Sequence, residues 1–160
     1  MYGYNYQYDT LWLDVMQFGY LYNWEAARVA CPSGWRLPTD NDWLQMEQTQ
    51  TDYGALNANG YRGDHAAKLA GGDWWEIAYG GSVPGNMSYA DRNKSGFSAV
   101  PAGYWRNSAN DAVRISACFW SNSEYNIGAL YRRLDYYDEG VYRYTADKAA
   151  GLSVRCVRDL

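Results

Sequence analysis

The sequence has little positive charge and no long hydrophobic run. Its 14 Lys and Arg are outnumbered by 18 Asp and Glu, which gives a net charge of −4 and a pI near 4.9. Nucleic acids and anionic membranes are bound through clustered Lys and Arg, so this balance argues against either as a partner. No apolar run approaches the roughly 20 residues that a membrane-spanning helix needs, so we expect no direct membrane insertion.

Histidine and cysteine are also scarce, which argues against catalysis. A thiol nucleophile needs a nearby base, whereas the only histidine, His65, stands alone in a Gly- and Asn-rich segment. We expect His65 to be a surface or loop residue. Cys118, one of three cysteines, directly precedes Phe119 and Trp120, and we interpret it as an incidental or variable position. The sequence therefore predicts no catalytic residue, no metal site and no cofactor.

Aromatic side chains, by contrast, are abundant and mostly tyrosine. The chain has 17 Tyr and 8 Trp but only 3 Phe. A buried tyrosine hydroxyl needs a hydrogen-bond partner, while a surface hydroxyl finds water. The excess of tyrosine therefore indicates many rings with one solvated edge. The 160 residues are enough to bury a core as a single domain, spanning residues 1–160.

Two helix starts stand out in the first third of the chain. Asn23 is an N-cap candidate for a helix over residues 24–30. Thr39 is a candidate for a second helix, whose first turn carries Asp40 and Asp42 at the positive end of the helix dipole. Capping explains these acidic residues without a metal ion.

Less regular structure is expected in two other regions. Residues 1–18 predict an N-terminal arm or strand, because tyrosines alternate there at Tyr2, Tyr4, Tyr6 and Tyr8. Residues 53–96 are rich in Gly and Asn and predict loops, with one helical turn near residues 64–70. We expect Trp74 and Trp75 to fill the core from a loop.

The clearest strand pattern lies near the carboxyl end. One alternating set of side chains is mainly apolar apart from arginine: Leu130, Arg132, Leu134, Tyr136, Val141 and Arg143. The intervening set is mainly tyrosine: Tyr131, Arg133, Asp135, Tyr137, Tyr142 and Tyr144. Period-two alternation is typical of strands, and residues 137–140 have the composition of a hairpin turn. The outward set resembles an antibody paratope, where tyrosine gives contact area at low entropic cost.

Four motifs, in a fixed order, resemble the landmarks of the Fibrobacter succinogenes major paralogous domain family. They are Gly34-Trp35-Arg36-Leu37-Pro38-Thr39, Gly96-Phe97-Ser98-Ala99-Val100-Pro101-Ala102-Gly103-Tyr104, Phe119-Trp120-Ser121 and Gly151-Leu152-Ser153-Val154-Arg155-Cys156-Val157-Arg158-Asp159. That family resembles the formylglycine-generating-enzyme branch of the C-type lectin fold, which includes the variable proteins of diversity-generating retroelements. The resemblance implies an α+β domain of two helices, a small twisted antiparallel sheet, long irregular loops and adjacent termini.

The same resemblance implies which positions vary. In retroelement variable proteins, replacement of template adenines turns asparagine-type codons into Tyr, Ser, Asp, Thr, Ile, Val, Ala, Gly and a few other residues. Such residue types occupy the outward positions Tyr125, Asn126, Ile127, Gly128, Tyr131, Arg133, Asp135, Tyr137, Asp138, Tyr142, Tyr144, Thr145, Ala146, Asp147, Ala149 and Ala150. A second patch of the same character comprises Asn107, Ser108, Ala109, Asn110, Asp111, Val113, Ile115 and Ser116. We therefore expect a variable ligand-binding region over residues 105–158, from which Glu139 departs because an asparagine codon does not reach it.

These patterns together predict ligand binding without chemistry. The anchors would be Tyr131, Tyr137, Tyr142 and Tyr144, and the ligand would be selected by the charges of Arg133, Asp135, Asp138 and Asp147. A rigid floor would be formed by Leu134, Val141, Val154, Trp35, Trp43 and Trp120. Beneath it, Arg132 and Arg143 would pair with backbone carbonyls or acidic residues.

Several alternatives stay open from the sequence. The tyrosines can instead be tolerant surface on a non-diversified structural domain, or the chain can be a formylglycine-generating-type enzyme with reactive cysteines. The C-type lectin fold often links positions such as those of Cys31 and Cys156 by a disulfide, so the resemblance makes this bond possible. Buried free thiols at both positions are equally compatible with the sequence. The expected partner is a macromolecule, either a protein or a cell-surface glycan. The expected location is a cell surface or phage particle, with any export signal or carrier segment outside this chain.

Overall fold

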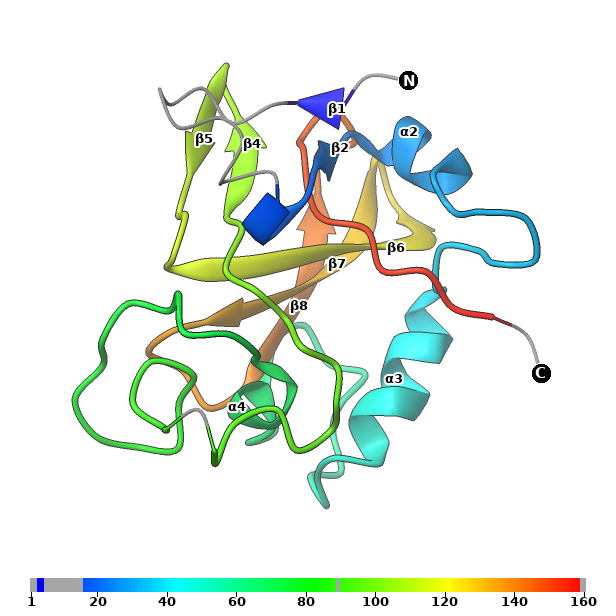
Figure 1. Cartoon of the computed structure of the whole chain (residues 1–160). Helices are drawn as coiled ribbons and strands as arrows, with labels where there is room; N and C mark the ends of the chain where they lie inside the picture. Colours follow the sequence, from blue (N-terminus) through cyan, green and yellow to red (C-terminus); the bar gives the residue numbers. More distant parts are fainter. Residues whose placement is uncertain (1–2, 5–15, 89, 159–160) are drawn as a thin grey trace.

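The computed structural model describes residues 3–4, 16–88 and 90–158. It mixes helix and sheet, with strands in the majority and antiparallel sheets, as the α+β prediction required. Figure 1 shows long strands at the centre with helices and a long irregular green loop around them. The elements are β1 (Gly3–Tyr4), β2 (Leu21–Tyr22), α2 (Trp24–Val29), α3 (Asp40–Gln48), β3 (Gly60–Arg62), α4 (Ala66–Leu69), β4 (Tyr104–Arg106), β5 (Ala109–Asp111), β6 (Ser116–Tyr125), β7 (Gly128–Asp135) and β8 (Val141–Ala146).

The main sheet has four strands in the order β3-β8-β7-β6, and each neighbouring pair is antiparallel. β7 and β8 form the predicted hairpin, with Arg133 opposite Tyr142. The chain reverses between these strands, where a Cβ on Gly140 would lie 3.0 Å from the Arg62 carbonyl oxygen. A glycine is needed there because the turn passes so close to the backbone of β3.

The long strand β6 is absent from the sequence prediction. All six residues of its first part, Ser116–Ser121, are buried. A strand buried on both faces shows no period-two alternation, which is why its pattern gave no signal. The pairing of β6 with β7 shifts register between Trp120 and Glu124, close to the turn at residues 126–127 that joins these two strands.

The helix predictions are confirmed. Asn23 caps α2 by accepting a hydrogen bond from the Ala26 N–H at 2.9 Å. Thr39 caps α3 in a capping box with Asp42, so each residue's side chain accepts from the other's backbone N–H. The short helix α4 lies inside the predicted turn over residues 64–70.

Separate apolar clusters cover the two faces of the sheet. On the side of α3, a cluster contains Trp43, Leu134 and Val141, and the Trp43 ring lies 5.8 Å from that of Phe119. On the other side, a second cluster contains Trp120 and packs α2 against β6. The predicted floor residues Trp43, Trp120, Leu134 and Val141 are therefore buried.

A buried ion network fixes α3 to the sheet. Glu47 accepts hydrogen bonds from Arg62 at 2.8 Å and from Arg132 at 2.9 Å. Asp40, seven residues earlier on the same helix, accepts from Arg132 at 2.7 Å and from Arg143 at 2.8 Å. Each guanidinium comes from a different strand, so two carboxylates on one helix tie together β3, β7 and β8. The prediction of acidic partners for Arg132 and Arg143 is confirmed.

The arginines keep both carboxylates ionised. Burial alone would raise the pKa of Asp40, but hydrogen bonds and charge from Arg143 and Arg132 outweigh it and lower the pKa. Burial of Glu47 is likewise outweighed by its contacts with His65, Arg132 and Arg62, and its pKa is lowered.

Residues on either side of α2 pair with the C-terminal segment. The Tyr22 N–H donates to the Leu152 carbonyl at 2.8 Å, and the Arg36 N–H donates to the Val157 carbonyl at 2.9 Å. Between these two pairs of residues, Cys31 and Cys156 form a disulfide with an S–S distance of 2.10 Å. Of the two alternatives that the sequence left open, the structure therefore has the disulfide and not two free thiols. The C-terminal segment, red in Figure 1, is thus fastened to the region around α2.

Four sequence expectations were wrong. His65 is completely buried beside Glu47 instead of lying on the surface, because α4, which it precedes, packs its Ala66 and Leu69 into the apolar core cluster that also contains Val141. Trp35 is 46% exposed and so is not part of the floor, and Trp74 is exposed while Trp75 alone fills the core. Gly128 is not free to vary, since a Cβ there would lie 2.6 Å from the Ala146 carbonyl oxygen.

The predicted N-terminal alternation falls almost entirely outside the described residues. Tyr2, Tyr6 and Tyr8 are not among them, whereas Gly3–Tyr4 forms β1 and pairs with β2. Among the helices of residues 3–4, 16–88 and 90–158, none combines the length and hydrophobicity needed to cross a bilayer.

Candidate functional site

The candidate site is the part of the main sheet's surface that points away from α3 and adjoins the second apolar cluster, against which Tyr131 is partly buried. We call it the tyrosine face, and it consists of Tyr61, Tyr131, Arg133, Tyr142 and Tyr144. Strand register brings these residues together: Tyr61 lies opposite Tyr142, Arg133 opposite Tyr142, and Tyr131 opposite Tyr144. Three strands, β3, β8 and β7, therefore contribute adjacent side chains to one surface.

The rings of the tyrosine face contact one another. The centroid of the Tyr142 ring lies 4.9 Å from that of Tyr61, 6.1 Å from that of Tyr144 and 6.2 Å from that of Tyr131. The Arg133 guanidinium lies 4.5 Å from the Tyr142 ring centroid and 5.7 Å from that of Tyr61. Because aromatic and cation–π contacts restrict the side-chain rotamers, the face is ordered before any ligand arrives.

Asp135 is a buried hydrogen-bond acceptor at the edge of this face. Its carboxylate accepts hydrogen bonds from the hydroxyls of Tyr61 and Ser116, and from the Arg133 Nε at 2.8 Å. Arg133 also donates to the Tyr61 hydroxyl at 2.9 Å. These contacts fix Arg133 and Tyr61 relative to each other and leave the rest of the guanidinium available to a ligand.

The electrostatics of the face follow from this arrangement. Burial, together with the hydrogen bond to Asp135, raises the pKa of Tyr61, so its hydroxyl stays protonated. Burial would lower the pKa of Arg133, but the Asp135 charge and the Tyr61 hydroxyl outweigh it and raise the pKa. The face therefore presents the protonated Tyr61 hydroxyl beside an Arg133 charge that the Asp135 carboxylate balances.

Asp135 itself does not match the prediction that it selects a ligand. Only 2% of Asp135 is exposed, and its oxygens are already occupied by three donors. The strand alternation placed it on the correct side of the sheet, but Tyr61 and Ser116 cover it. Asp135 therefore supports the tyrosine face instead of contacting a ligand. Ser116, which belongs to the second predicted patch, is buried beside it.

A pocket of about 250 Å³ adjoins the tyrosine face. It extends from Tyr131 and Arg133 to Tyr104 and Arg106 of β4, and Thr145 and Asp147 line it from β8 and the residue that follows. Cys118 forms part of its floor, and burial raises the pKa of that thiol. Burial also raises the pKa of Tyr131. The pocket thus offers two phenols and two guanidinium groups but no thiolate.

Other predicted residues lie at the two ends of the hairpin. Tyr125 is the last residue of β6, and Asn126 and Ile127 form the turn that leads into β7, where Ile127 is 98% exposed. Tyr137 and Asp138 lie at the opposite end of β7; Tyr137 reaches within 3.3 Å of the Tyr61 hydroxyl, and Asp138 accepts the Gly140 N–H within the turn. Tyr137 therefore extends the tyrosine face, whereas residues 125–127 lie at the far end of the strand.

The second predicted patch is divided in the structure. Asn107 and Ser108 form the exposed tip of the β4–β5 hairpin, next to Arg106 in the pocket. Asp111 accepts a hydrogen bond from the Tyr104 hydroxyl at 3.1 Å. Ile115 is exposed, but Val113 is partly buried against a small apolar cluster. Of this patch, Asn107, Ser108 and Asp111 lie near the tyrosine face, because they adjoin Tyr104 and Arg106, which line the pocket beside that face.

Sequence reasoning missed three residues of the site. Tyr61 lies in a Gly- and Asn-rich segment that gave no strand signal, although its neighbours Asn59 and Gly60 suit the start of a short edge strand. Tyr104 and Arg106 sit in a three-residue strand, β4. A strand so short has too few positions for alternation to be recognised.

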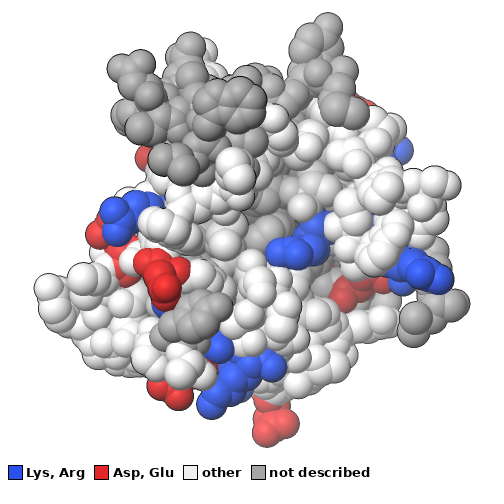
Figure 2. Space-filling model, viewed as in Figure 1, with Lys and Arg blue, Asp and Glu red and all other residues white. Residues whose placement is uncertain are grey.

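The arrangement suits recognition of another molecule's surface. Tyrosine and arginine are the residue types that dominate binding energy at interfaces, and here they lie on strands held by the buried ion network. Figure 2 shows charges of both signs scattered among uncharged residues on the face it presents. Within residues 3–4, 16–88 and 90–158, no group of three His, Cys, Asp or Glu side chains has a metal-binding arrangement.

Comparison with known proteins identifies the class of this domain. The fold and face define a mixed helix and sheet domain with a tyrosine-rich surface on its main sheet. The chain belongs to the Fibrobacter succinogenes major domain family, whose sequence profile matches residues 2–158. No curated protein and no solved structure matches the chain.

Proposed function

We propose that this chain is a ligand-binding variable protein of a diversity-generating retroelement, with a C-type lectin-like fold. It binds a macromolecular ligand, a protein or a cell-surface glycan, through the tyrosine face and the adjoining pocket. The observation that carries the proposal is the convergence of four tyrosine rings and Arg133 on one ordered surface. The pairing of residues on either side of α2 with the C-terminal segment supports the lectin-like part of the proposal.

The two faces of the sheet have different roles, which supports diversification of the outward residues. Arg132 and Arg143 secure the inner face through Asp40 and Glu47, while Tyr142 and Tyr144, which flank Arg143 on β8, point outward. Outward residues can change while the inward contacts that stabilise the fold stay the same. The diversified set excludes Asp135 and Gly128, because one is a buried acceptor and the other meets backbone.

The state of the cysteines favours binding over the enzymatic alternative. A formylglycine-generating-type reaction requires a reactive pair of thiols. Cys31 and Cys156 are joined in a disulfide, and Cys118 is buried with a raised pKa. Because the thiolate is the nucleophilic form, Cys118 is unsuited to that chemistry near neutral pH.

A displayed library tests the proposal without knowledge of the natural ligand. One library randomises Tyr131, Tyr142, Tyr144 and Asp147, and a matched library randomises the inward residues Leu130, Leu134, Val141 and Arg143. We expect the outward library to keep most members resistant to protease and to yield binders to a purified test protein such as lysozyme. Loss of protease resistance in both libraries to the same extent, or no binders from the outward library, would contradict the proposal.

A further inference from the structure

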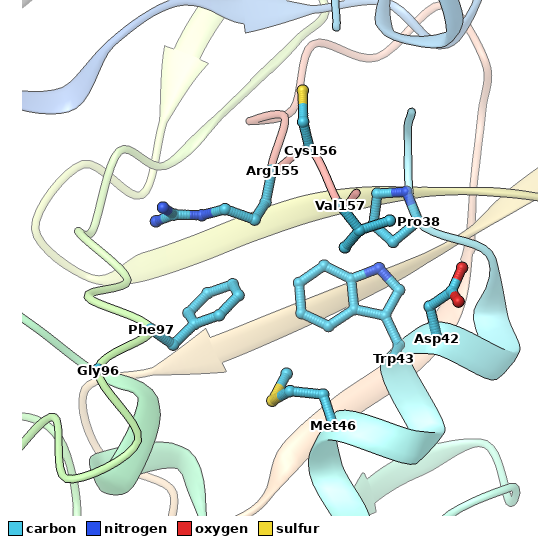
Figure 3. A pocket seen from close by; sticks show the side chains of 9 residues that line it. All are labelled: Pro38, Asp42, Trp43, Met46, Gly96, Phe97, Arg155, Cys156 and Val157. Carbon is cyan, nitrogen blue, oxygen red and sulfur yellow. The ribbon is translucent and has the colours of Figure 1, made fainter. Parts of the chain in front are cut away.

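A second pocket lies on the α3 side of the sheet, away from the tyrosine face. It has a volume of about 290 Å³ and is lined by Pro38, Asp42, Trp43, Met46, Gly96, Phe97 and the backbone and side chains of residues 155–157. Figure 3 shows the Trp43 indole, Met46 and Phe97 along one side and Pro38 and Val157 along the other. Its size and mainly apolar lining are those of a small-molecule site.

The walls of this pocket are held in place by strong contacts. The backbone pairing of Arg36 with Val157 and the Cys31–Cys156 disulfide fix the C-terminal wall. The ring of Trp43 lies 5.5 Å from that of Phe97, and its indole N–H donates to the Trp120 carbonyl at 3.4 Å. A pocket whose walls are already fixed loses little entropy when a ligand binds.

The two charged residues of the pocket differ in their surroundings. Asp42 is fully engaged: it accepts two hydrogen bonds from Arg36, at 2.6 and 3.2 Å, and one from the Thr39 N–H at 2.7 Å. Arg155 makes no hydrogen bond or ion pair with residues 3–4, 16–88 or 90–158, and its guanidinium instead lies 4.7 Å from the Phe97 ring centroid. Desolvation lowers the pKa of Arg155.

We propose that this pocket binds a small hydrophobic carboxylate. The apolar part of the ligand packs against Trp43, Met46 and Phe97, and its carboxylate pairs with the Arg155 guanidinium. Arginine suits this role because its planar fork matches two carboxylate oxygens. An anion is favoured over a cation, since the Asp42 carboxylate is already neutralised by Arg36, whereas Arg155 has no ion-pair partner among the described residues. The volume limits the ligand to about the size of a phenylpropionate.

The probe is 3-phenylpropionate, titrated into the intact chain while the indole N–H signals are followed by NMR. We expect the Trp43 signal to shift with a Kd of about 0.1–1 mM, the range for a ligand of this size. The neutral isostere 3-phenylpropanol shares the apolar contacts but lacks the carboxylate. We expect it to bind about tenfold more weakly, because it does not pair with Arg155.

Variants test whether phenylpropionate binds at Arg155 and not elsewhere on the protein. Arg155→Gln should weaken phenylpropionate binding about tenfold and leave phenylpropanol unchanged, while Arg155→Lys should have an intermediate effect. Arg158→Gln is the matched control, because Arg158 is an exposed arginine on the same segment and lies outside the pocket. Tyr144→Ala should also leave the titration unchanged, which makes the result independent of the tyrosine face.

Two results would overturn the proposal. One is the absence of a Trp43 shift at about 10 mM phenylpropionate, well above the expected Kd. The other is equal binding by the parent chain and by Arg155→Gln, with both shown to be folded by their urea midpoints. Either result would leave the function proposed for the tyrosine face unaffected.

Discussion

Arg132 and Arg143 lie directly opposite each other on β7 and β8, and both donate to the carboxylate of Asp40. Two like charges at paired positions repel each other unless an anion lies between them. Asp40 supplies that anion from α3, and Glu47 supplies a second for Arg132 and Arg62. The stiffness of the tyrosine face therefore depends on residues of the opposite face.

The first prediction concerns Asp40. The change Asp40→Asn leaves Arg132 and Arg143 without their shared anion, so we expect the free energy of unfolding to fall by about 3 kcal/mol. Urea denaturation followed by tryptophan fluorescence measures this loss. Asp52→Asn serves as control, because Asp52 is exposed and should change stability by less than about 0.5 kcal/mol. Equal effects of the two changes would contradict the role of Asp40.

A second prediction follows from the lowered pKa values of Asp40 and Glu47. A carboxyl group whose pKa is lower in the folded state stabilises the fold above its unfolded pKa, and this contribution is lost as the pH falls through the folded pKa. Stability should therefore be steady from neutral pH to about pH 5 and decline below about pH 4, where unfolded carboxyl groups begin to bind protons.

Urea titrations at a series of pH values measure this dependence. The decline should be shallower in Asp40→Asn than in the parent chain, because one of the two lowered pKa values has been removed. A parallel decline in both proteins would show that other groups govern the acid sensitivity.

The third prediction concerns the cysteines. The Cys31–Cys156 disulfide closes a loop with a sequence separation of 125 residues, so its reduction should cost about 5 kcal/mol of stability. A thiol reagent should label no cysteine in the native chain, one in urea without reductant, and all three in urea after reduction. Labelling of a thiol pair in the native state would support the enzymatic alternative.

A fourth prediction distinguishes exposed side chains of the tyrosine face from the buried Asp135 that supports them. Tyr137→Ala and Tyr144→Ala remove side chains that are about half exposed, and each should lower stability by less than about 1 kcal/mol. Asp135→Ala leaves Arg133, Tyr61 and Ser116 without their acceptor and should cost about 3 kcal/mol. Thermal unfolding of the three variants measures both effects, and a larger loss from either tyrosine change than from Asp135→Ala would reverse these roles.

Local signals predicted much of this fold. Asn23 and Thr39 mark helix starts because capping depends on residues within three positions. The β7–β8 hairpin is visible because one set of alternating residues is apolar or arginine and the other is mainly tyrosine, a period-two pattern typical of strands. The exposure of Asp135 was not predictable, since its burial depends on Tyr61, which is 74 residues away in the sequence. His65 is comparable, because its burial results from the packing of α4 into the apolar core cluster and not from its sequence neighbours.

The central claim is that the tyrosine face varies while the ion network beneath it stays constant. Sequencing the coding locus from many closely related isolates, together with any neighbouring imperfect repeat and reverse transcriptase gene, tests it most directly. We predict amino-acid changes concentrated at Tyr131, Tyr142, Tyr144 and Asp147, with Asp40, Glu47, Arg132 and Arg143 unchanged. Changes spread evenly over exposed residues, or an invariant tyrosine face with no such repeat nearby, would contradict the claim.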